Sequence, residues 1–420
     1  MAKQTKQWAA IIMMIALFAM IAFVTNLCSP MATIVKNQFG ASELAGQIGN
    51  YANFIAYLVM GIPSGMLIAK FGYKKTALLA LIVGLVGIGF EYLSGVAGSY
   101  WIYLIGAFIS GLCMCMLNTV VNPLLNVLGG GGKTGNQLIQ IGGAFNSASA
   151  VAVYILMGAL IGEVTKSTGI SDATPALLIA GIIFALAFVI LLFTKIEEPE
   201  QAKVELNLIT GALKFPQLSL GALAIFLYMS VEVGTPTYMI SYLQTDAVGL
   251  SAGVAGLIAS VYWLMMFLGR SVGGSIGSKV SSRAMVSTVA AVAIVLLLFG
   301  IFAPESWKVT VVGIDWGKLE VIYPQVPACV LAFILVGLCT SVMWGGIFNM
   351  AVEGLGKYTA AASGIFMTMV FGCAVMVGLQ AWVADIVGYL YSYFIPVACA
   401  AYILFYALVG SKVKKVDTPE

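Results

Sequence analysis

Charged residues are scarce in this chain, and histidine is absent. Only 9% of the 420 residues are charged, 61% are hydrophobic, and the mean hydropathy is +1.03. A soluble domain would carry about 25% charged residues. The composition therefore excludes an ordinary soluble protein and predicts a protein that crosses a membrane many times. The lack of histidine excludes proton relays and metal sites that depend on imidazole.

The seven cysteines indicate neither disulfides nor a metal site, and the one stretch that resembles a phosphate-binding loop does not indicate a nucleotide site. All seven cysteines lie in apolar segments and none forms a Cys-x-x-Cys pair, so we expect neither disulfides nor a metal site. Residues 129–134 (GGGGKT) end like a nucleotide-binding loop, but the first glycine of that motif would fall at Val127 and no strand precedes it. We expect a hinge between two spans and no cofactor. The net charge of +3 without a basic stripe gives no indication of nucleic acid binding.

Apolar stretches of about 20 residues, the length that crosses a bilayer as a helix, recur throughout the chain. The sequence predicts an all-α membrane protein with twelve transmembrane helices. We place them at residues 8–35, 44–69, 74–94, 100–128, 137–162, 175–194, 217–244, 252–278, 284–303, 326–350, 359–385 and 390–410. The first run is too long for a signal peptide and lacks a clear cleavage site, so we expect a retained span.

Positive charges predict the orientation. With both termini in the cytoplasm, the external side receives only Lys36, Lys166, Lys308 and Lys318 of the 20 lysines and arginines, a strong positive-inside bias. The longest charged stretch between spans, residues 195–214, divides the spans into six and six. We expect an N-terminal half of residues 1–195, a cytoplasmic linker at 196–216 and a C-terminal half of residues 217–420.

Two loops on the external side have recognisable patterns. Residues 36–43 are polar and separate the first two spans. Residues 304–325 form the longest external loop, and alternating apolar residues around Asp315 and Gly317 fit either a small hairpin or an irregular loop.

Glu232 is the one carboxylate that this segmentation places deep inside a span. A charge at that depth costs about 2.5 kcal/mol or more, and such residues usually face a bundle interior and act on a substrate or ion path. The alternative is a neutral glutamic acid that serves packing. Pro236 has no backbone donor and should break or kink the same helix, as happens at transporter sites. Glu91 and Asp385 fall near span ends and are expected to need no special role.

Amide side chains gather in the spans of the first half, and aromatic side chains accompany Glu232 in the second. We expect substrate contacts at Asn26, Asn50, Asn53, Asn118, Asn122, Asn146, Tyr228, Glu232, Tyr262, Trp263, Trp344 and Asn349. Amides and hydroxyls with aromatic faces suit a neutral sugar in a largely apolar pocket. For a single amide the alternative is a hydrogen bond between helices, and for an aromatic ring it is packing or an interfacial belt.

A repeated pattern follows the second and eighth spans. Residues 65–75 and 269–283 each combine small residues at helical spacing with cations at a predicted cytoplasmic helix end. We expect gating contacts from Lys70, Lys74, Arg270 and Lys279, and for Arg270 the alternative is snorkelling to the interface. The stretch 65–75 resembles the loop signature of the major facilitator superfamily, but Ala69 stands where that signature usually has an acid. The resemblance implies two six-helix halves that rock about a central site.

A narrower resemblance covers most of the chain. Residues 118–129 (NTVVNPLLNVLG) and 144–147 (AFNS) resemble motifs of the fucose:proton symporter family, which includes the glucose/galactose transporters. Residues 230–234 (SVEVG), 262–263 (YW) and 353–358 (EGLGKY) resemble its glucose/galactose branch. The family usually carries an aspartate in the first span, where this chain reads TNLCSP at 25–30. The fourth-span acid or glutamine of the family corresponds to Asn118 here.

Together these features predict a secondary transporter, not an enzyme, that moves a small neutral sugar by alternating access. Coupling to a proton or to sodium through Glu232 is one hypothesis, with Ser230 and Thr235 as oxygen ligands if the ion is sodium. A sugar uniporter, given the missing acids, and an exporter of amphipathic cations are the alternatives. The resemblance implies a monomer in the inner membrane of a bacterium, with the lipid bilayer as its surroundings.

Overall fold

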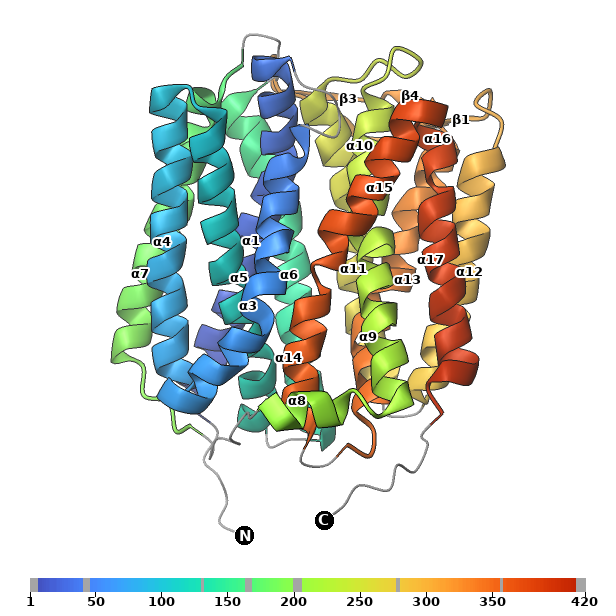
Figure 1. Ribbon diagram of the computed structural model, residues 1–420. Coiled ribbons are helices and arrows are strands. Elements are labelled where there is room, and N and C mark those ends of the chain that lie inside the picture. The colour runs from blue at the N-terminus through green and yellow to red at the C-terminus, as the bar shows by residue number, and fades with distance from the viewer. Residues whose placement is uncertain are drawn as a thin grey trace.

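The computed structural model describes residues 7–40, 46–129, 132–162, 168–198, 206–276, 280–355 and 358–412. Within these residues, twelve helical spans are long and apolar enough to cross a membrane, which confirms the predicted number. They form one bundle, with the β-strands at one end and α8 (Leu206–Ala212) at the other (Figure 1). We call these the strand end and the linker end.

The first six spans form one side of the bundle in Figure 1. They are α1 (Trp8–Phe39), α3 (Ile48–Phe71), α4 (Tyr73–Ala97), α5 (Tyr100–Leu128), α6 (Gly132–Ile161) and, after the short turn η1 (Ile170–Ala173), α7 (Thr174–Phe193). The helix α1 continues into the stretch 36–43 that was predicted to be a polar loop. It ends at Gly40, whose φ of 60° is left-handed. Glycine adopts this conformation without a steric penalty, which makes it a common helix terminator.

The other six spans form the opposite side of the bundle in Figure 1, and the seventh and the eleventh are interrupted near their middle. They comprise α9 (Pro216–Met229), η2 (Ser230–Gly234), α10 (Thr235–Leu243), α11 (Ala252–Ile276), α12 (Ser282–Phe302), α13 (Cys329–Val352), α14 (Thr359–Met369), α15 (Gly372–Val387), α16 (Tyr389–Ser392), α17 (Phe394–Phe405) and η4 (Tyr406–Gly410). The break in the seventh span was expected from Pro236. The eleventh span, predicted at 359–385, is present at Ala361–Val387, but it has an interruption that was not predicted, because α14 ends before α15 begins.

The break in the eleventh span lies against α9. A Cβ atom at Gly372 would overlap the carbonyl oxygen of Phe226. Only glycine allows two helix backbones to approach this closely. The break in the eleventh span therefore packs on α9 one turn before the break in the seventh span, and α15 also contacts η2 itself.

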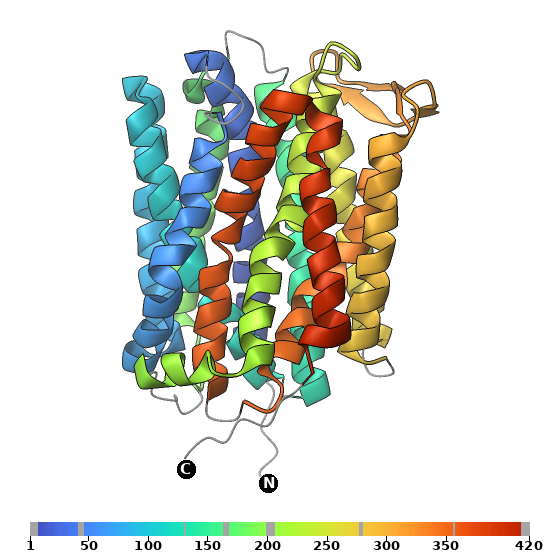
Figure 2. The ribbon, with the colours of Figure 1, turned by 45° about the vertical axis from the view of Figure 1, so that its right-hand side comes forward.

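The long loop at the strand end forms a small hairpin structure, one of the two expected alternatives. Strand β1 (Lys308–Thr310) pairs antiparallel with β4 (Gln325–Pro327), and β2 (Gly313–Asp315) pairs antiparallel with β3 (Glu320–Ile322) (Figure 2). The Asp315 Oδ1 atom accepts hydrogen bonds from the N–H groups of Gly317 (3.0 Å) and Lys318 (3.1 Å). An aspartate that binds the backbone of its own turn in this way stabilises the reversal.

Trp316, the residue after β2, packs between the two halves at the strand end. A Cβ atom at Gly158 of α6 would overlap its ring, and one at Gly253 of α11 would lie 3.1 Å from its Nε1 atom. The side chain is only 9% exposed. Because α6 and α11 belong to different halves, the indole ring contacts both.

The halves also meet along two pairs of helices. On one side α6 packs along α11, and on the other α3 packs against α14 and α15. The hydroxyls of Tyr51 and Tyr238 lie 3.4 Å apart at the strand end. Further along α3 toward the linker end, ten residues after Tyr51, a Cβ atom at Gly61 would lie 2.6 Å from the backbone nitrogen of Thr368. Contact between the halves thus extends through most of the bundle.

The linker is attached to the first half by acidic side chains. Glu198 accepts hydrogen bonds from the N–H groups of Tyr73 (2.7 Å) and Lys74 (3.1 Å) at the start of α4. A carboxylate is favoured there because the first N–H groups of a helix lack partners and carry partial positive charge. An acid from the linker therefore lies beside the stretch 65–75, where Ala69 replaces the expected one. The exact limits of the two halves and the linker remain predictions.

The interface at Gly61 yields a testable prediction. We expect Gly61→Ala to destabilise the protein by roughly 1–3 kcal/mol, because the added methyl group meets the backbone of Thr368 and the helices must separate. Gly65, one turn later on the same helix, is the matched control, since a Cβ atom there meets nothing within 4 Å. Gly65→Ala should be neutral or stabilising by up to about 1 kcal/mol. Thermal unfolding in detergent measures both, and equal midpoints for the two variants would contradict the close contact.

Candidate functional site

Glu232 lies in the middle of the π-helical segment η2, at the break in the seventh span. In a regular helix the N–H group of residue 236 would bind the carbonyl of residue 232, but Pro236 has no N–H. The wider π turn accommodates this missing bond, and such turns frequently mark functional sites. The Glu232 side chain is 14% exposed. The acid is thus held in the interior at a local irregularity of the backbone.

Arg270 of α11 is the cation nearest to this acid. Its Nη2 atom lies 3.7 Å from Glu232 Oε1, and its side chain is 13% exposed. Its Nη1 atom donates to the carbonyl oxygen of Gly143 (2.6 Å) and to Ser147 Oγ (2.9 Å), both on α6. Of the two alternatives for Arg270, the contact between helices is observed. One guanidinium group therefore joins Glu232 in the second half to α6 in the first.

Aromatic side chains surround η2. The Tyr228 hydroxyl donates to the carbonyl of Thr340 (3.1 Å), and the Tyr262 hydroxyl lies 2.9 Å from Thr340 Oγ1. The Trp344 ring packs against Tyr228 with centroids 6.1 Å apart, and Trp263 packs edge-on against Tyr262 at 5.4 Å. The four predicted aromatic residues are therefore neighbours of Glu232 or of one another.

Three of the predicted amides are partly exposed in the first half, and two of them, Asn118 and Asn122, are neighbours on α5. Asn118 donates to the hydroxyl of Tyr57 (2.9 Å), and Asn122 donates to the carbonyl of Asn118 (3.0 Å). Asn146 donates to the carbonyl of Phe18 on α1 (2.9 Å). Each amide has two N–H donors and a carbonyl acceptor, so one bond leaves capacity for a ligand. Asn118 and Asn146 link helices, Asn122 binds within its own helix, and all three retain polar atoms for a ligand.

The remaining amides are placed differently. Asn26 is buried and donates to the carbonyl of Ala22 in its own helix (2.9 Å). Asn50 and Asn53 are buried in the first half, where Asn53 donates to the Cys28 sulfur (3.5 Å). Asn349, in contrast, is exposed near the end of α13. The structure does not bring these four amides to the Glu232 cluster.

Cys373, at the break in the eleventh span, lies between the two groups. The thiol is fully buried, and α15 packs against η2, which carries Glu232, and against α3, which carries Tyr57. The amide group around Asn118 and the acid therefore face a common region, to which both halves contribute.

Within the described residues, neither Lys70 nor Lys74 forms a contact that crosses between the halves. Lys74 Nζ donates to the carbonyls of Leu192 (3.0 Å) and Thr194 (2.7 Å), at the end of α7 in its own half. Lys70 is exposed and lies over the ring of Phe71, 5.2 Å from its centroid. Lys279 lies outside the described residues. A gating role for these lysines remains a prediction.

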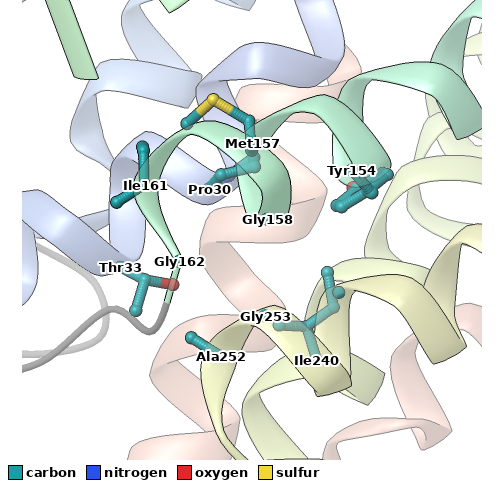
Figure 3. A pocket seen from close by; sticks show the side chains of 11 residues that line it. Pro30, Thr33, Tyr154, Met157, Gly158, Ile161, Gly162, Ile240, Ala252 and Gly253 are labelled. Carbon is teal, nitrogen blue, oxygen red and sulfur yellow. The ribbon is translucent and has the colours of Figure 1, made fainter. Parts of the chain in front are cut away.

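Two cavities lie between the halves at the strand end. One has a volume of about 310 Å³ and is lined mainly by polar residues, including Lys36, Gln47, Gln244 and Asp246. The other, shown in Figure 3, has only about 40 Å³ and lies between α1, α6, α10 and α11. A space of this size holds water but no sugar. Only the larger cavity reaches the size usual for small-molecule sites.

Known proteins resemble this chain in sequence along most of its length. The sequence matches the model of the Major Facilitator Superfamily over residues 13–378. The chain belongs to this superfamily. It is 26% identical over 403 residues to the glucose/galactose transporter of Brucella abortus, covering 94% of this chain and 92% of that protein. It is 22% identical over 424 residues to the L-fucose-proton symporter of Escherichia coli, covering 94% and 92%.

The solved structures agree with the fold of a major facilitator. A crystal structure of the Escherichia coli fucose:proton symporter superposes with a TM-score of 0.74 at 20% identity and covers 97% of this chain and all of that one. A second structure of that protein, in the outward conformation, gives 0.73. The resemblance to the fucose:proton symporter and glucose/galactose family is confirmed, and the relatives are transporters, not enzymes.

Several residues at this facilitator's site were not predicted from the sequence. Ser147 and Gly143 accept the Arg270 bonds, and Thr340 binds both tyrosines. Hydroxyls and glycines carry no charge or aromatic pattern that would single them out. Ser147 could have been predicted, because it belongs to the AFNS motif at 144–147.

The contacts of Arg270 predict an asymmetry between two substitutions. Arg270→Gln removes two hydrogen bonds from a charged donor, each worth roughly 1.5–3 kcal/mol, and leaves Glu232 without its cation. Glu232→Gln removes only the 3.7 Å pair and leaves Arg270 bound to α6. We expect Arg270→Gln to lower the thermal unfolding midpoint more than Glu232→Gln.

The double variant tests whether the two side chains are coupled. Arg270→Gln should cost less in the Glu232→Gln background, because no unpaired acid remains. Thermal unfolding of all four proteins in detergent gives the coupling. Effects that add within about 0.5 kcal/mol would argue against a direct interaction.

Proposed function

We propose that this protein is a secondary transporter that moves a small neutral sugar across a bacterial inner membrane by alternating access. One observation carries the proposal. Helix α15, which follows the break in span eleven, packs both on η2, beside Tyr228 and Trp344, and on α3, whose Tyr57 accepts a hydrogen bond from Asn118. Broken helices near the middle of the bundle are typical of transporter sites. The relatives named as sugar transporters match more than 90% of the chain.

The chemistry of the region suits a sugar. Asn118, Asn122 and Asn146 retain donors and acceptors for hydroxyl groups. The Trp344 ring is partly exposed and packed in place by Tyr228, so it offers an aromatic face for the apolar side of a hexose. Trp263, at 8% exposed, is more enclosed, and its Nε1 atom has no partner in the described structure. We expect Trp344 to contact the sugar directly and Trp263 to support Tyr262.

The larger cavity at the strand end is suited to admit the sugar. Its polar lining and its volume of about 310 Å³ fit a hydrated monosaccharide. Lys36 and Gln47 line it from the first half, and Gln244 and Asp246 line it from the second. A movement of one half against the other would therefore widen or close this cavity.

Glu232 and Arg270 connect the site to the contact between the halves. A sugar hydroxyl that binds Glu232 competes with Arg270, and a guanidinium released from Glu232 changes its hold on Gly143 and Ser147. Coupling of a proton or sodium through Glu232 remains a hypothesis, and a uniporter remains the alternative. The pair argues against an exporter of amphipathic cations, because Arg270 already neutralises the acid that such a substrate would need.

The proposed function is tested by uptake of labelled monosaccharides into proteoliposomes, with an imposed proton gradient, a sodium gradient or none. We expect uptake of glucose or galactose, with Asn122→Ala and Asn146→Ala each raising KM about tenfold, the equivalent of one hydrogen bond of about 1.4 kcal/mol. Glu232→Gln should lower the rate under every gradient. Normal transport by Glu232→Gln in all conditions would remove Glu232 from the mechanism, and no uptake of any sugar would refute the sugar proposal.

The orientation is a separate prediction. We propose that the linker end faces the cytoplasm, because most lysines and arginines belong to that side. Green fluorescent protein fused to the C-terminus should fluoresce, and alkaline phosphatase fused there should be inactive. A fusion of alkaline phosphatase within the loop 304–325 should show the reverse. Active phosphatase at the C-terminus would contradict the proposed orientation.

A further inference from the structure

Glu91 is a second interior carboxyl group, although its position near a span end suggested no role. It lies on α4, six residues before the end of that helix, and is only 6% exposed. Its Oε1 atom accepts a hydrogen bond from Ser110 Oγ of α5 (2.8 Å). A Cβ atom at Gly106 would lie 2.8 Å from Glu91 Cγ, and one at Gly87 would lie 2.6 Å from Ser110 Oγ. Two glycines thus let α4 and α5 close around the carboxyl group.

No cation pairs with Glu91 among the described residues. The titratable groups that face it are the Cys28 thiol of α1 and the Tyr103 phenol of α5. Helix α7, which also packs on α4, has no titratable side chain, and the Asp172 carboxylate of η1 is exposed and bound to the N–H group of Gly169 (2.8 Å). On α3 the only charged side chain is Lys70, at the linker end.

This environment disfavours the ionised form. An isolated carboxylate in an apolar interior costs far more than a single hydroxyl donor returns. Glu232 differs, because Arg270 lies 3.7 Å away and can hold it ionised. Of the two interior acids, Glu91 is the one that has no cation to favour its ionised form in the described structure.

Polar groups lead from Glu91 in two directions. Toward the centre, Cys28 faces Glu91 and accepts a hydrogen bond from Asn53, and Tyr57 lies one turn along α3 from Asn53 and accepts from Asn118. The Asn53 Oδ1 atom is fully buried and has no partner in the described structure. A buried polar atom of this kind usually binds a water molecule or a mobile ligand.

Toward the strand end, the connection is shorter. A Cβ atom at Gly49 would lie 2.7 Å from the Tyr103 hydroxyl, so the phenol packs on α3 at that point. Gln47, two residues earlier, lines the cavity of about 310 Å³. Glu91 therefore lies between this cavity and the amide group of the proposed sugar site.

We propose that Glu91 is a proton-binding site of the first half, whose proton is exchanged with water as the two halves move. The exchange is a simple acid dissociation, in which the carboxyl O–H bond breaks and the proton passes to water. Its use in transport rests on the proposed function, whereas the protonated state itself does not. Glu232 then acts through Arg270 on the contact between the halves, and Glu91 carries the proton.

The protonated state is tested without any sugar. Infrared spectra of the purified protein at pH 7, in H2O and D2O, should contain the carbonyl band of a protonated carboxylic acid. The band should be lost in Glu91→Gln and kept in Glu232→Gln. Absence of the band in the native protein, or its persistence in Glu91→Gln, would overturn the proposal.

The coupling role is tested in proteoliposomes with labelled galactose. We expect Glu91→Gln to retain counterflow, which needs no net proton movement, and to lose accumulation driven by a proton gradient. Glu91→Asp keeps an acid at this position and should retain proton-driven accumulation at least in part, which separates loss of the proton from loss of packing. Accumulation by Glu91→Gln at the native level, or accumulation by the native protein with sodium alone, would overturn the coupling role. If the native protein transports no sugar while the infrared result holds, the sugar proposal fails and the proton site stands.

Discussion

The organisation of this protein depends on how Arg270 is satisfied inside the bundle. A guanidinium group that is 13% exposed cannot rely on water, so it takes its partners from both halves: Glu232 on η2, and Gly143 and Ser147 on α6. The consequence is that the contact between the halves includes the acid at the centre of the candidate site. A ligand that displaces Arg270 from Glu232 also changes the contact of Arg270 with α6, and thereby the contact between the halves.

The backbone irregularities lie near the contact between Arg270 and Glu232. The π segment at Ser230–Gly234 accommodates the missing donor of Pro236, and the eleventh span breaks where Gly372 meets the backbone of α9. A helix that is interrupted costs hydrogen bonds, which in a membrane are not replaced by water. Interruption at two neighbouring points, next to an acid and a group of aromatic rings, is therefore best explained by a requirement of the site.

Much of the fold follows from local patterns, whereas the site depends on distant contacts. Apolar length predicted twelve spans, the alternating residues around Asp315 predicted the hairpin as one alternative, and Pro236 predicted the break in the seventh span. The break before Gly372 was missed, and it lies where α15 closely approaches the backbone of α9, a contact between distant segments that no local sequence pattern encodes. The same limit explains Arg270, whose partners lie more than 100 residues away on α6.

The comparison of the two interior acids shows why position along a span is a poor guide to role. Glu232 was singled out because it lies deep in its span, yet its charge is balanced by Arg270. Glu91 was set aside because it lies near the end of its span, yet Gly87 and Gly106 let α5 cover it. Burial is produced by the neighbouring helix and not by depth alone. An acid with a cation suits a contact that must form and release, and an acid without one suits a proton that must bind and leave.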